Sequence, residues 1–99
     1  MKKIRSLSEI KEVVKPLAEK YQIAKVYLFG SYARNEANDN SDMDFLIYGD
    51  KNFKSVNVFA FAEELRLFFN NSVDVFAINE INKESPFYKN IMKDRIAII

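Results

Sequence analysis

The chain has 99 residues, enough for one domain with a single core and too few for a catalytic module joined to a separate acceptor-binding domain. Hydrophobic residues make up 48% of it, so we expect a folded protein and exclude a disordered one. Fifteen basic against fourteen acidic residues leave a net charge of +1, which argues against strong nucleic-acid binding; the absence of Cys and His excludes disulfides, thiol chemistry and imidazole bases. We therefore expect residues 1–99 to form one domain.

A period of 3.6 residues predicts the first helix over residues 7–21. Ser6 or Ser8 can cap its start, and with Ser6 as the cap Glu9 occupies the third helical position and completes a capping box. Pro16 lacks an amide hydrogen, so we expect a bend in this helix.

The next elements lead up to an acidic segment. Residues 24–29 are short and rich in β-forming side chains, which predicts the first strand. Residues 31–37 tolerate helix well, so we expect one or two helical turns there. Residues 38–41 are typical of a loop, and residues 42–48 are expected to form the second strand.

The second half of the chain alternates between helix and strand again. A helix beginning at Ser55 or Asn57 is apolar on so much of its surface that it is either sandwiched in the fold or offered to another chain. Ser85-Pro86 is a typical helix start, with the cap followed by proline. The elements expected here are a helix to about 69, a strand over 73–78, a helix to about 94 and a strand over 95–99. The whole order predicts an α/β fold with a mixed sheet of about four strands and helices mainly on one side.

No stretch approaches membrane-spanning length, and the two lysines at the N-terminus are not followed by a continuous apolar segment. We expect a cytoplasmic protein.

The most informative stretch joins the first two strands. Gly30-Ser31 is followed, after ten residues, by Asp42-Met43-Asp44. In a strand, the period of two puts both carboxylates on one side, about 7 Å apart at Cα. They repel each other unless a cation joins them. Gly30 permits close backbone approach, and Ser31 adds a hydroxyl donor at the start of the expected short helix, whose first amides would point positive charge outward.

This spacing resembles the signature of the nucleotidyltransferase superfamily related to DNA polymerase β. The wider string Gly-Ser-Tyr-Ala-Arg…Ser-Asp-Met-Asp-Phe-Leu-Ile resembles its minimal branch, whose members are typically antitoxins encoded beside a HEPN-domain toxin. The resemblance implies a small nucleotidyltransferase fold and a reaction that moves AMP from ATP to a hydroxyl, most plausibly a toxin tyrosine. It also implies a complex with the toxin, and a homo- or hetero-oligomer is open.

The resemblance also assigns roles to residues. Asp42 and Asp44 would hold two Mg²⁺ ions together with a third carboxylate. Asp74 is the natural candidate for it, because an ionised Asp inside an apolar strand is costly without a partner; the alternative is an edge residue facing solvent. Gly30 and Ser31 would bind the nucleotide phosphates. Arg34, three residues past Ser31, can reach a phosphate or the partner's surface, and the alternative is a solvated surface position.

One position departs from the pattern. Asn35 stands where the small-protein branch commonly has Gly; Asn tolerates left-handed backbone next best, but its side chain could narrow access to the site. Glu36 and Asp39 also lie in the connecting segment, and we interpret both as solvated.

Three functions are compatible with these features. The first is a Mg²⁺-dependent nucleotidyltransferase acting as an antitoxin. The second is a catalytically weak or inactive subunit that neutralises its partner by binding. The third, with less support, is an aminoglycoside-modifying enzyme whose pocket would require an oligomer.

Overall fold

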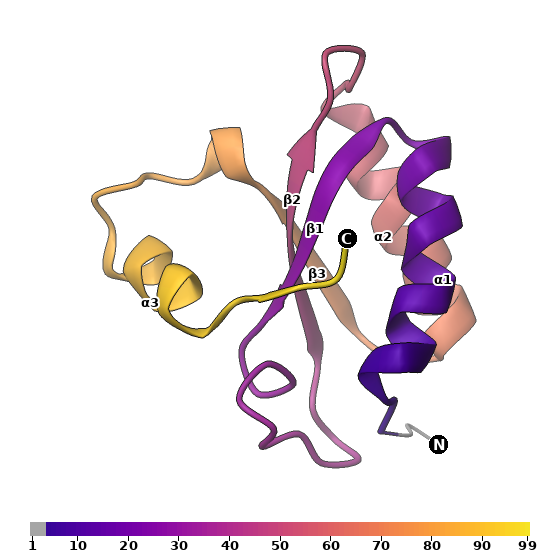
Figure 1. Cartoon of the computed structure of the whole chain (residues 1–99), viewed down its shortest axis with the longest axis vertical. Helices are drawn as coiled ribbons and strands as arrows, with labels where there is room; N and C mark the ends of the chain where they lie inside the picture. Colours follow the sequence, from indigo (N-terminus) through magenta and orange to yellow (C-terminus); the bar gives the residue numbers. More distant parts are fainter. Residues whose placement is uncertain (1–3) are drawn as a thin grey trace.

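The computed structural model describes residues 4–99 as a four-stranded sheet flanked by helices (Figure 1). The strands lie in the order β3-β2-β1-β4; β2 and β3 are parallel, and β1 is antiparallel to both β2 and β4. The elements are α1 (Leu7–Lys20), β1 (Ile23–Phe29), β2 (Met43–Gly49), α2 (Val56–Phe69), β3 (Val73–Ala77), η1 (Ile78–Glu80), α3 (Pro86–Asp94) and β4 (Ile96–Ala97). The expected mixed α/β fold is confirmed.

The start of α1 follows the sequence pattern closely. The Ser6 hydroxyl accepts a hydrogen bond from the Glu9 amide at 3.1 Å, and the Glu9 carboxylate accepts one from the Ser6 amide at 3.2 Å. The predicted capping box with Ser6 as cap is therefore confirmed. The helix continues through Pro16, and the bend expected there stays a prediction.

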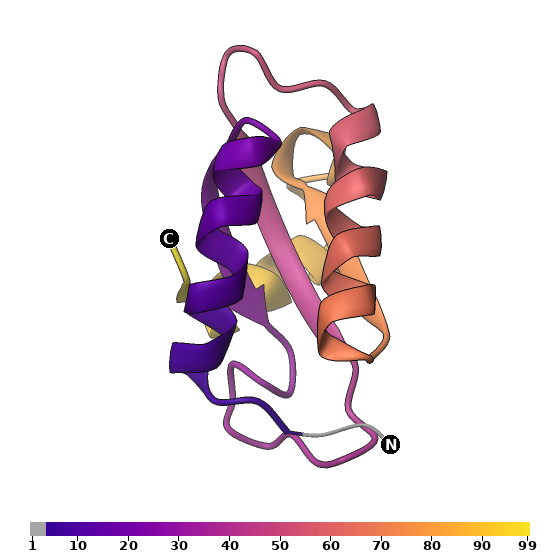
Figure 2. The same cartoon turned by 90° about the vertical axis from the view of Figure 1, so that its right-hand side faces the viewer.

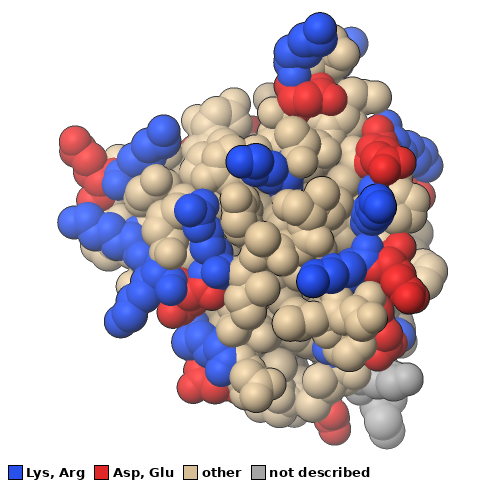
Figure 3. Space-filling view, viewed as in Figure 1, with Lys and Arg blue, Asp and Glu red and all other residues tan. Residues whose placement is uncertain are grey.

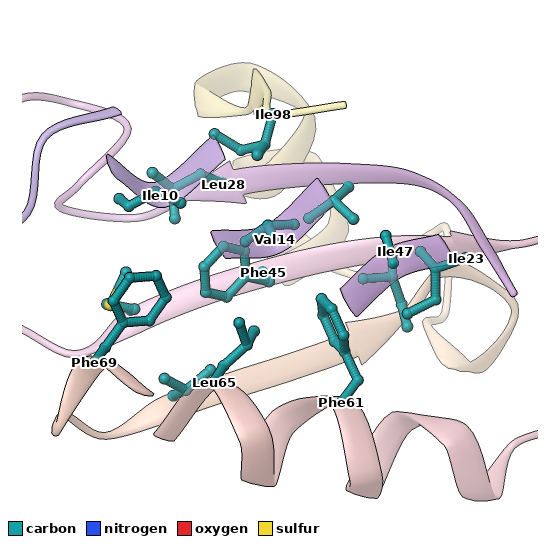
Figure 4. Close-up of a cluster of buried hydrophobic side chains, with 14 of the residues drawn as sticks. Ile10, Val14, Ile23, Leu28, Phe45, Ile47, Phe61, Leu65, Phe69 and Ile98 are labelled. Carbon is teal, nitrogen blue, oxygen red and sulfur yellow. The ribbon is translucent and has the colours of Figure 1, made fainter. Parts of the chain in front are cut away.

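The main core lies between the sheet and two helices. Helices α1 and α2 lie side by side on one face of the sheet, and α3 lies on the other (Figures 1 and 2). Figure 4 shows apolar side chains from α1, α2 and the strands meeting between these layers. The fully buried members include Ile10, Val14, Val26, Leu28, Phe45, Ile47, Phe61 and Leu65. Because strand residues alternate between faces, the intervening positions of β1 and β2 face α3, where Phe29, Leu46 and Ile91 form a second cluster.

The prediction of a short helix over residues 31–37 is wrong. Residues 30–35 form a turn instead, in which the Arg34 amide donates to the Gly30 carbonyl at 3.1 Å and the Glu36 amide donates to the Ser31 carbonyl at 2.9 Å. Asn35 has φ +58°, a left-handed conformation that an α-helix cannot continue through.

The last helix has the expected bounds, whereas the last strand is shorter than expected. The strand predicted over 95–99 is limited to Ile96–Ala97, because Arg95 still closes α3 by donating its amide to the Ile91 carbonyl at 2.9 Å. Beyond β4, the Ile98 amide still donates to the Val26 carbonyl at 2.8 Å, so the end of the chain stays along β1.

Basic and acidic side chains lie intermixed around the edge of the face seen in Figure 3. Across residues 4–99, no helix is both long and apolar enough to cross a membrane. The two lysines near the N-terminus lie outside these described residues.

Candidate active site

The end of β1 meets the starts of β2 and β3 at one end of the sheet (Figure 1). Phe29 pairs with Asp44, and Asp44 pairs with Asp74. Residues paired directly across neighbouring strands project from the same face, and such strands lie about 4.8 Å apart. Asp44 and Asp74 are therefore side by side on the same face of the sheet as α3, and Asp74 is exposed on the edge strand β3. Asp42 is exposed just before β2, two residues from Asp44.

The electrostatics of Asp44 reflect this crowding. Its side chain is partly buried, and burial is the main cause that raises its pKa from 3.8 to about 6. The neighbouring carboxylates of Asp74 and then Asp42 raise the pKa further, whereas Arg34 opposes the shift. Burial and the neighbouring negative charges thus disfavour the ionised form of Asp44, and a nearby cation would stabilise it.

Two features of position 30 require glycine: the backbone conformation and the lack of room for a side chain. Its φ of +74° lies in the left-handed region that favours glycine. A Cβ atom built on Gly30 would lie 2.7 Å from Oδ2 of Asp44. The backbone of the turn therefore approaches the Asp44 carboxylate too closely to leave room for a side chain at position 30.

Ser31 is the second residue of the turn and caps no helix, because no helix follows it. The idea that helix-start amides form the phosphate cradle is therefore wrong. In the described turn the amides of Arg34, Asn35 and Glu36 donate the backbone hydrogen bonds, and those of residues 31–33 find no backbone acceptor among residues 4–99. The Ser31 hydroxyl likewise has no partner in the part of the chain that the structure describes. These donors can bind an anion.

Arg34 is already engaged in ion pairs. Its Nε donates to Glu36 at 2.6 Å and one terminal nitrogen donates to Asp94 at 3.0 Å, which ties the turn to the end of α3. Arg34 is nevertheless near enough to lower the pKa of Asp44. A phosphate contact by Arg34, which would have to compete with these carboxylates, stays a prediction.

Asp42, Asp44 and Asp74 suit Mg²⁺ because they offer carboxylate oxygens, and because burial and like charges make ionised Asp44 unfavourable without a cation. Carboxylate oxygens are the ligands that Mg²⁺ prefers. No group of three Asp or Glu side chains within residues 4–99 is gathered closely enough to hold an ion as it stands. Asp44 and Asp74 are adjacent in register, and Asp42 acts on Asp44 electrostatically. The three-carboxylate metal site therefore stays a prediction.

The site lies along an open end of the sheet. A cavity of about 480 Å³ lies between the start of α1 and the turn after Gly30, where Tyr32, Ala33 and Asn35 line it. Two others, of about 410 and 290 Å³, lie between α1 and α2 and beside the loop after β2. None of these three is lined by Asp42, Asp44 or Asp74. A ligand at the carboxylates would be reached directly from solvent.

Sequence reasoning missed two features near the site. Asp94, the partner of Arg34, is 60 residues away in the chain and gives no local signal. An aromatic cluster of Phe29, Phe76 and Phe87 also borders the carboxylates. Phe29 directly precedes Gly30 and Phe76 stands two residues after Asp74, so a period of two could have placed these two rings on the face of the carboxylates.

Comparisons with known proteins agree with the fold. The sequence model of the family described as "Polymerase beta, Nucleotidyltransferase" matches residues 11–99. "Putative protein adenylyltransferase MJ0126" of Methanocaldococcus jannaschii is 32% identical over 100 residues, 97% of this chain and 100% of the relative.

Solved structures are similar as well. A crystal structure of a toxin–antitoxin with AMP-PNP superposes with a TM-score of 0.76 at 16% identity, over 90% of this chain and 72% of that chain. A structure of a tri-AMPylated Shewanella oneidensis HEPN toxin in complex with MNT antitoxin superposes with a TM-score of 0.71 at 14% identity, over 95% of this chain and 72% of that chain. At these identities the structures show a shared fold.

Proposed function

Because the chain belongs to the polymerase beta nucleotidyltransferase family, we propose that it transfers AMP from ATP to a hydroxyl group of a protein. The acceptor in this proposal is a tyrosine of a HEPN-domain toxin, and the modification neutralises the toxin. Two findings support it. A relative that aligns over its whole length is named a putative protein adenylyltransferase. A protein of the same fold is the MNT antitoxin in a complex with a tri-AMPylated HEPN toxin. The proposal treats residues 1–99 as one domain.

The parts of the site have separate roles in this reaction. The Ser31 hydroxyl and the amides of residues 31–33 donate hydrogen bonds to the phosphates of ATP. Asp42, Asp44 and Asp74 would hold two Mg²⁺ ions, which when bound neutralise phosphate charge and lower the pKa of the acceptor hydroxyl. The acceptor oxygen forms a bond to the α-phosphorus, the bond between the α-phosphorus and the bridging oxygen breaks, pyrophosphate leaves, and the hydroxyl proton passes to solvent.

One observation carries the proposal: Asp44 lies in register with Asp74 and directly against the backbone of Gly30. The proposed metal ligands therefore lie next to the turn that carries the proposed phosphate donors. A purely structural carboxylate would not be expected in this place, because burial and like charges both oppose its ionisation.

The direct test is transfer of label from α-labelled ATP to a purified HEPN-domain protein of the same genome, in the presence of Mg²⁺. We expect label on the partner with the parent protein and none with Asp44→Asn. Asp39→Asn is the matched control, since Asp39 is an exposed acid of the same connecting segment, and it should label as the parent does. Label that persists in Asp44→Asn would contradict the proposal.

A second candidate is neutralisation by binding alone, and the outer side of α2 favours it. Four large apolar residues on this helix are exposed, namely Val56 at 64%, Phe59 at 73%, Leu67 at 73% and Phe68 at 62%. Such a surface is typical of contact with another protein. Toxin neutralisation by Asp44→Asn, with a tight complex and no label, would support this candidate over catalysis.

A further inference from the structure

We propose that the cluster of Phe29, Phe76 and Phe87 is a nucleobase platform, with the base of the bound nucleoside triphosphate stacked on the exposed ring of Phe87. This inference rests on the proposed function, because it assigns the base of the same nucleotide whose phosphates lie at the Gly30 turn.

The platform is continuous with the carboxylates. Phe29 pairs with Asp44 across β1 and β2, and Phe76 follows Asp74 by two residues on the same face of β3, roughly 7 Å along the strand. The Phe29 and Phe76 ring centroids are 5.9 Å apart although these residues stand on the two strands that flank β2. Their rings therefore meet over β2, where Phe29 pairs with Asp44 and Phe76 pairs with Leu46.

Phe87 holds an exposed ring in a defined place. Its centroid lies 5.1 Å from that of Phe76 and 6.0 Å from that of Phe29, both in edge-to-face contacts. Phe87 remains 43% exposed, whereas Phe29 is buried. A ring that is fixed on one side and open on the other can stack on a base with little further loss of conformational freedom.

Phe87 suits the base better than the other aromatic residues that could stack on it. With the phosphates at the turn and the α-phosphate at Asp44 and Asp74, the platform would take a base that lies one ribose away, toward Phe76 and the start of α3. Two other aromatic residues on this face, Tyr27 and Tyr48, have ring centroids 5.6 Å apart and are both engaged by Arg95. The Arg95 guanidinium lies over Tyr27 at 4.6 Å and donates to the Tyr48 hydroxyl at 3.2 Å. Phe59 is exposed on α2, on the opposite face of the sheet (Figure 1).

The first test compares ligands with and without a base. Phe87→Ala should weaken binding of AMP-PNP roughly ten-fold or more, since a base stacked on an aromatic ring contributes strongly to affinity. Binding of inorganic tripolyphosphate should stay unchanged. Phe87→Leu keeps an apolar side chain without the aromatic face and should give the same pattern, which separates stacking from a loss of folding. Phe59→Ala is the matched control and should bind both ligands as the parent does.

A second test uses the absence of tryptophan from the chain. In Phe87→Trp the indole is the only one present, so AMP-PNP should quench its fluorescence and tripolyphosphate should not. The indole of Phe59→Trp should respond to neither ligand.

The outcomes separate this inference from the proposed function. Unchanged AMP-PNP affinity in both Phe87→Leu and Phe87→Ala, with weaker binding in Asp44→Asn, would overturn the platform and leave the proposed function standing. Phe87→Leu that binds nucleotide normally but loses the HEPN-domain partner would overturn it in favour of a protein contact. A parent protein that binds neither ligand would overturn both.

Discussion

Gly30 is the residue at which the turn and the carboxylates constrain each other most tightly. Gly30→Ala would place a Cβ 2.7 Å from Oδ2 of Asp44 and force alanine to a φ of +74°. We expect a loss of about 1 kcal/mol in the free energy of unfolding and at least a ten-fold loss of AMP transfer, because the carboxylate must move. Urea unfolding and the labelling assay measure the two effects; full labelling at parental stability would contradict the close packing.

The raised pKa of Asp44, about 6, leads to a prediction about how the free energy of unfolding depends on pH. Below pH 3.8 the carboxyl is protonated in the folded and the unfolded protein; between 3.8 and about 6 only the folded protein keeps the proton. Folding therefore takes up a proton in this range, and the contribution of Asp44 to the free energy of unfolding falls as the pH rises from about 4 to about 6. Asp44→Asn removes this titration, so the variant should be more stable than the parent at pH 7.

Urea unfolding at several pH values between 4 and 7 gives the difference in stability between Asp44→Asn and the parent. That difference should grow in favour of the variant with rising pH and level off above about 6, whereas Asp39→Asn should follow the parent. Parallel stability profiles of the parent and Asp44→Asn would show that Asp44 is not electrostatically crowded.

Individual helix ends give predictions at the scale of the element. Ser6→Ala removes the acceptor for the Glu9 amide at the start of α1 and should lower the free energy of unfolding by about 1 kcal/mol. Ser8→Ala is the matched control, since Ser8 is exposed within the first turn and caps nothing. Equal losses in the two variants, measured by urea unfolding, would mean that the capping box does not stabilise the helix.

Local chemistry explains which elements the sequence predicts well. The capping box of α1 involves only residues 6–9, so the sequence contains all of it. Ser85-Pro86 likewise marks the start of α3, where the Ser85 hydroxyl accepts a hydrogen bond from the Tyr88 amide. The turn after Gly30 was mistaken for a helix because its residues have adequate helix propensity, and the left-handed Asn35 overrides it. Asn35 does keep the turn where the minimal branch has Gly, as its tolerance of this conformation predicts.

The placement of α3 depends on contacts far apart in the sequence. Asp94 meets Arg34, and Phe87 meets Phe29, only because α3 crosses the face of the sheet opposite α1 and α2. No local pattern contains this information. The pair Asp42 and Asp44 could be found from spacing alone, but the surroundings of the site on the α3 side could not.

At the scale of the whole molecule, the exposed apolar side of α2 predicts where a partner binds. Phe59→Ser should reduce affinity for the HEPN-domain protein at least ten-fold, because it removes exposed aromatic surface. Its free energy of unfolding should change by less than about 1 kcal/mol, since the side chain is 73% exposed. Calorimetric titration measures the affinity, with Lys51→Ser in the loop after β2 as control; parental affinity in Phe59→Ser would exclude this surface.

The central claim is that Asp44 and its neighbours bind a divalent ion together with a nucleotide. Electron paramagnetic resonance of Mn²⁺, used in place of Mg²⁺ with saturating AMP-PNP, tests it without any partner protein. We predict that the parent and Asp39→Asn remove the free Mn²⁺ signal beyond what AMP-PNP alone removes, and that Asp44→Asn does not. An equal loss of free Mn²⁺ signal with Asp44→Asn and with the parent would contradict the account.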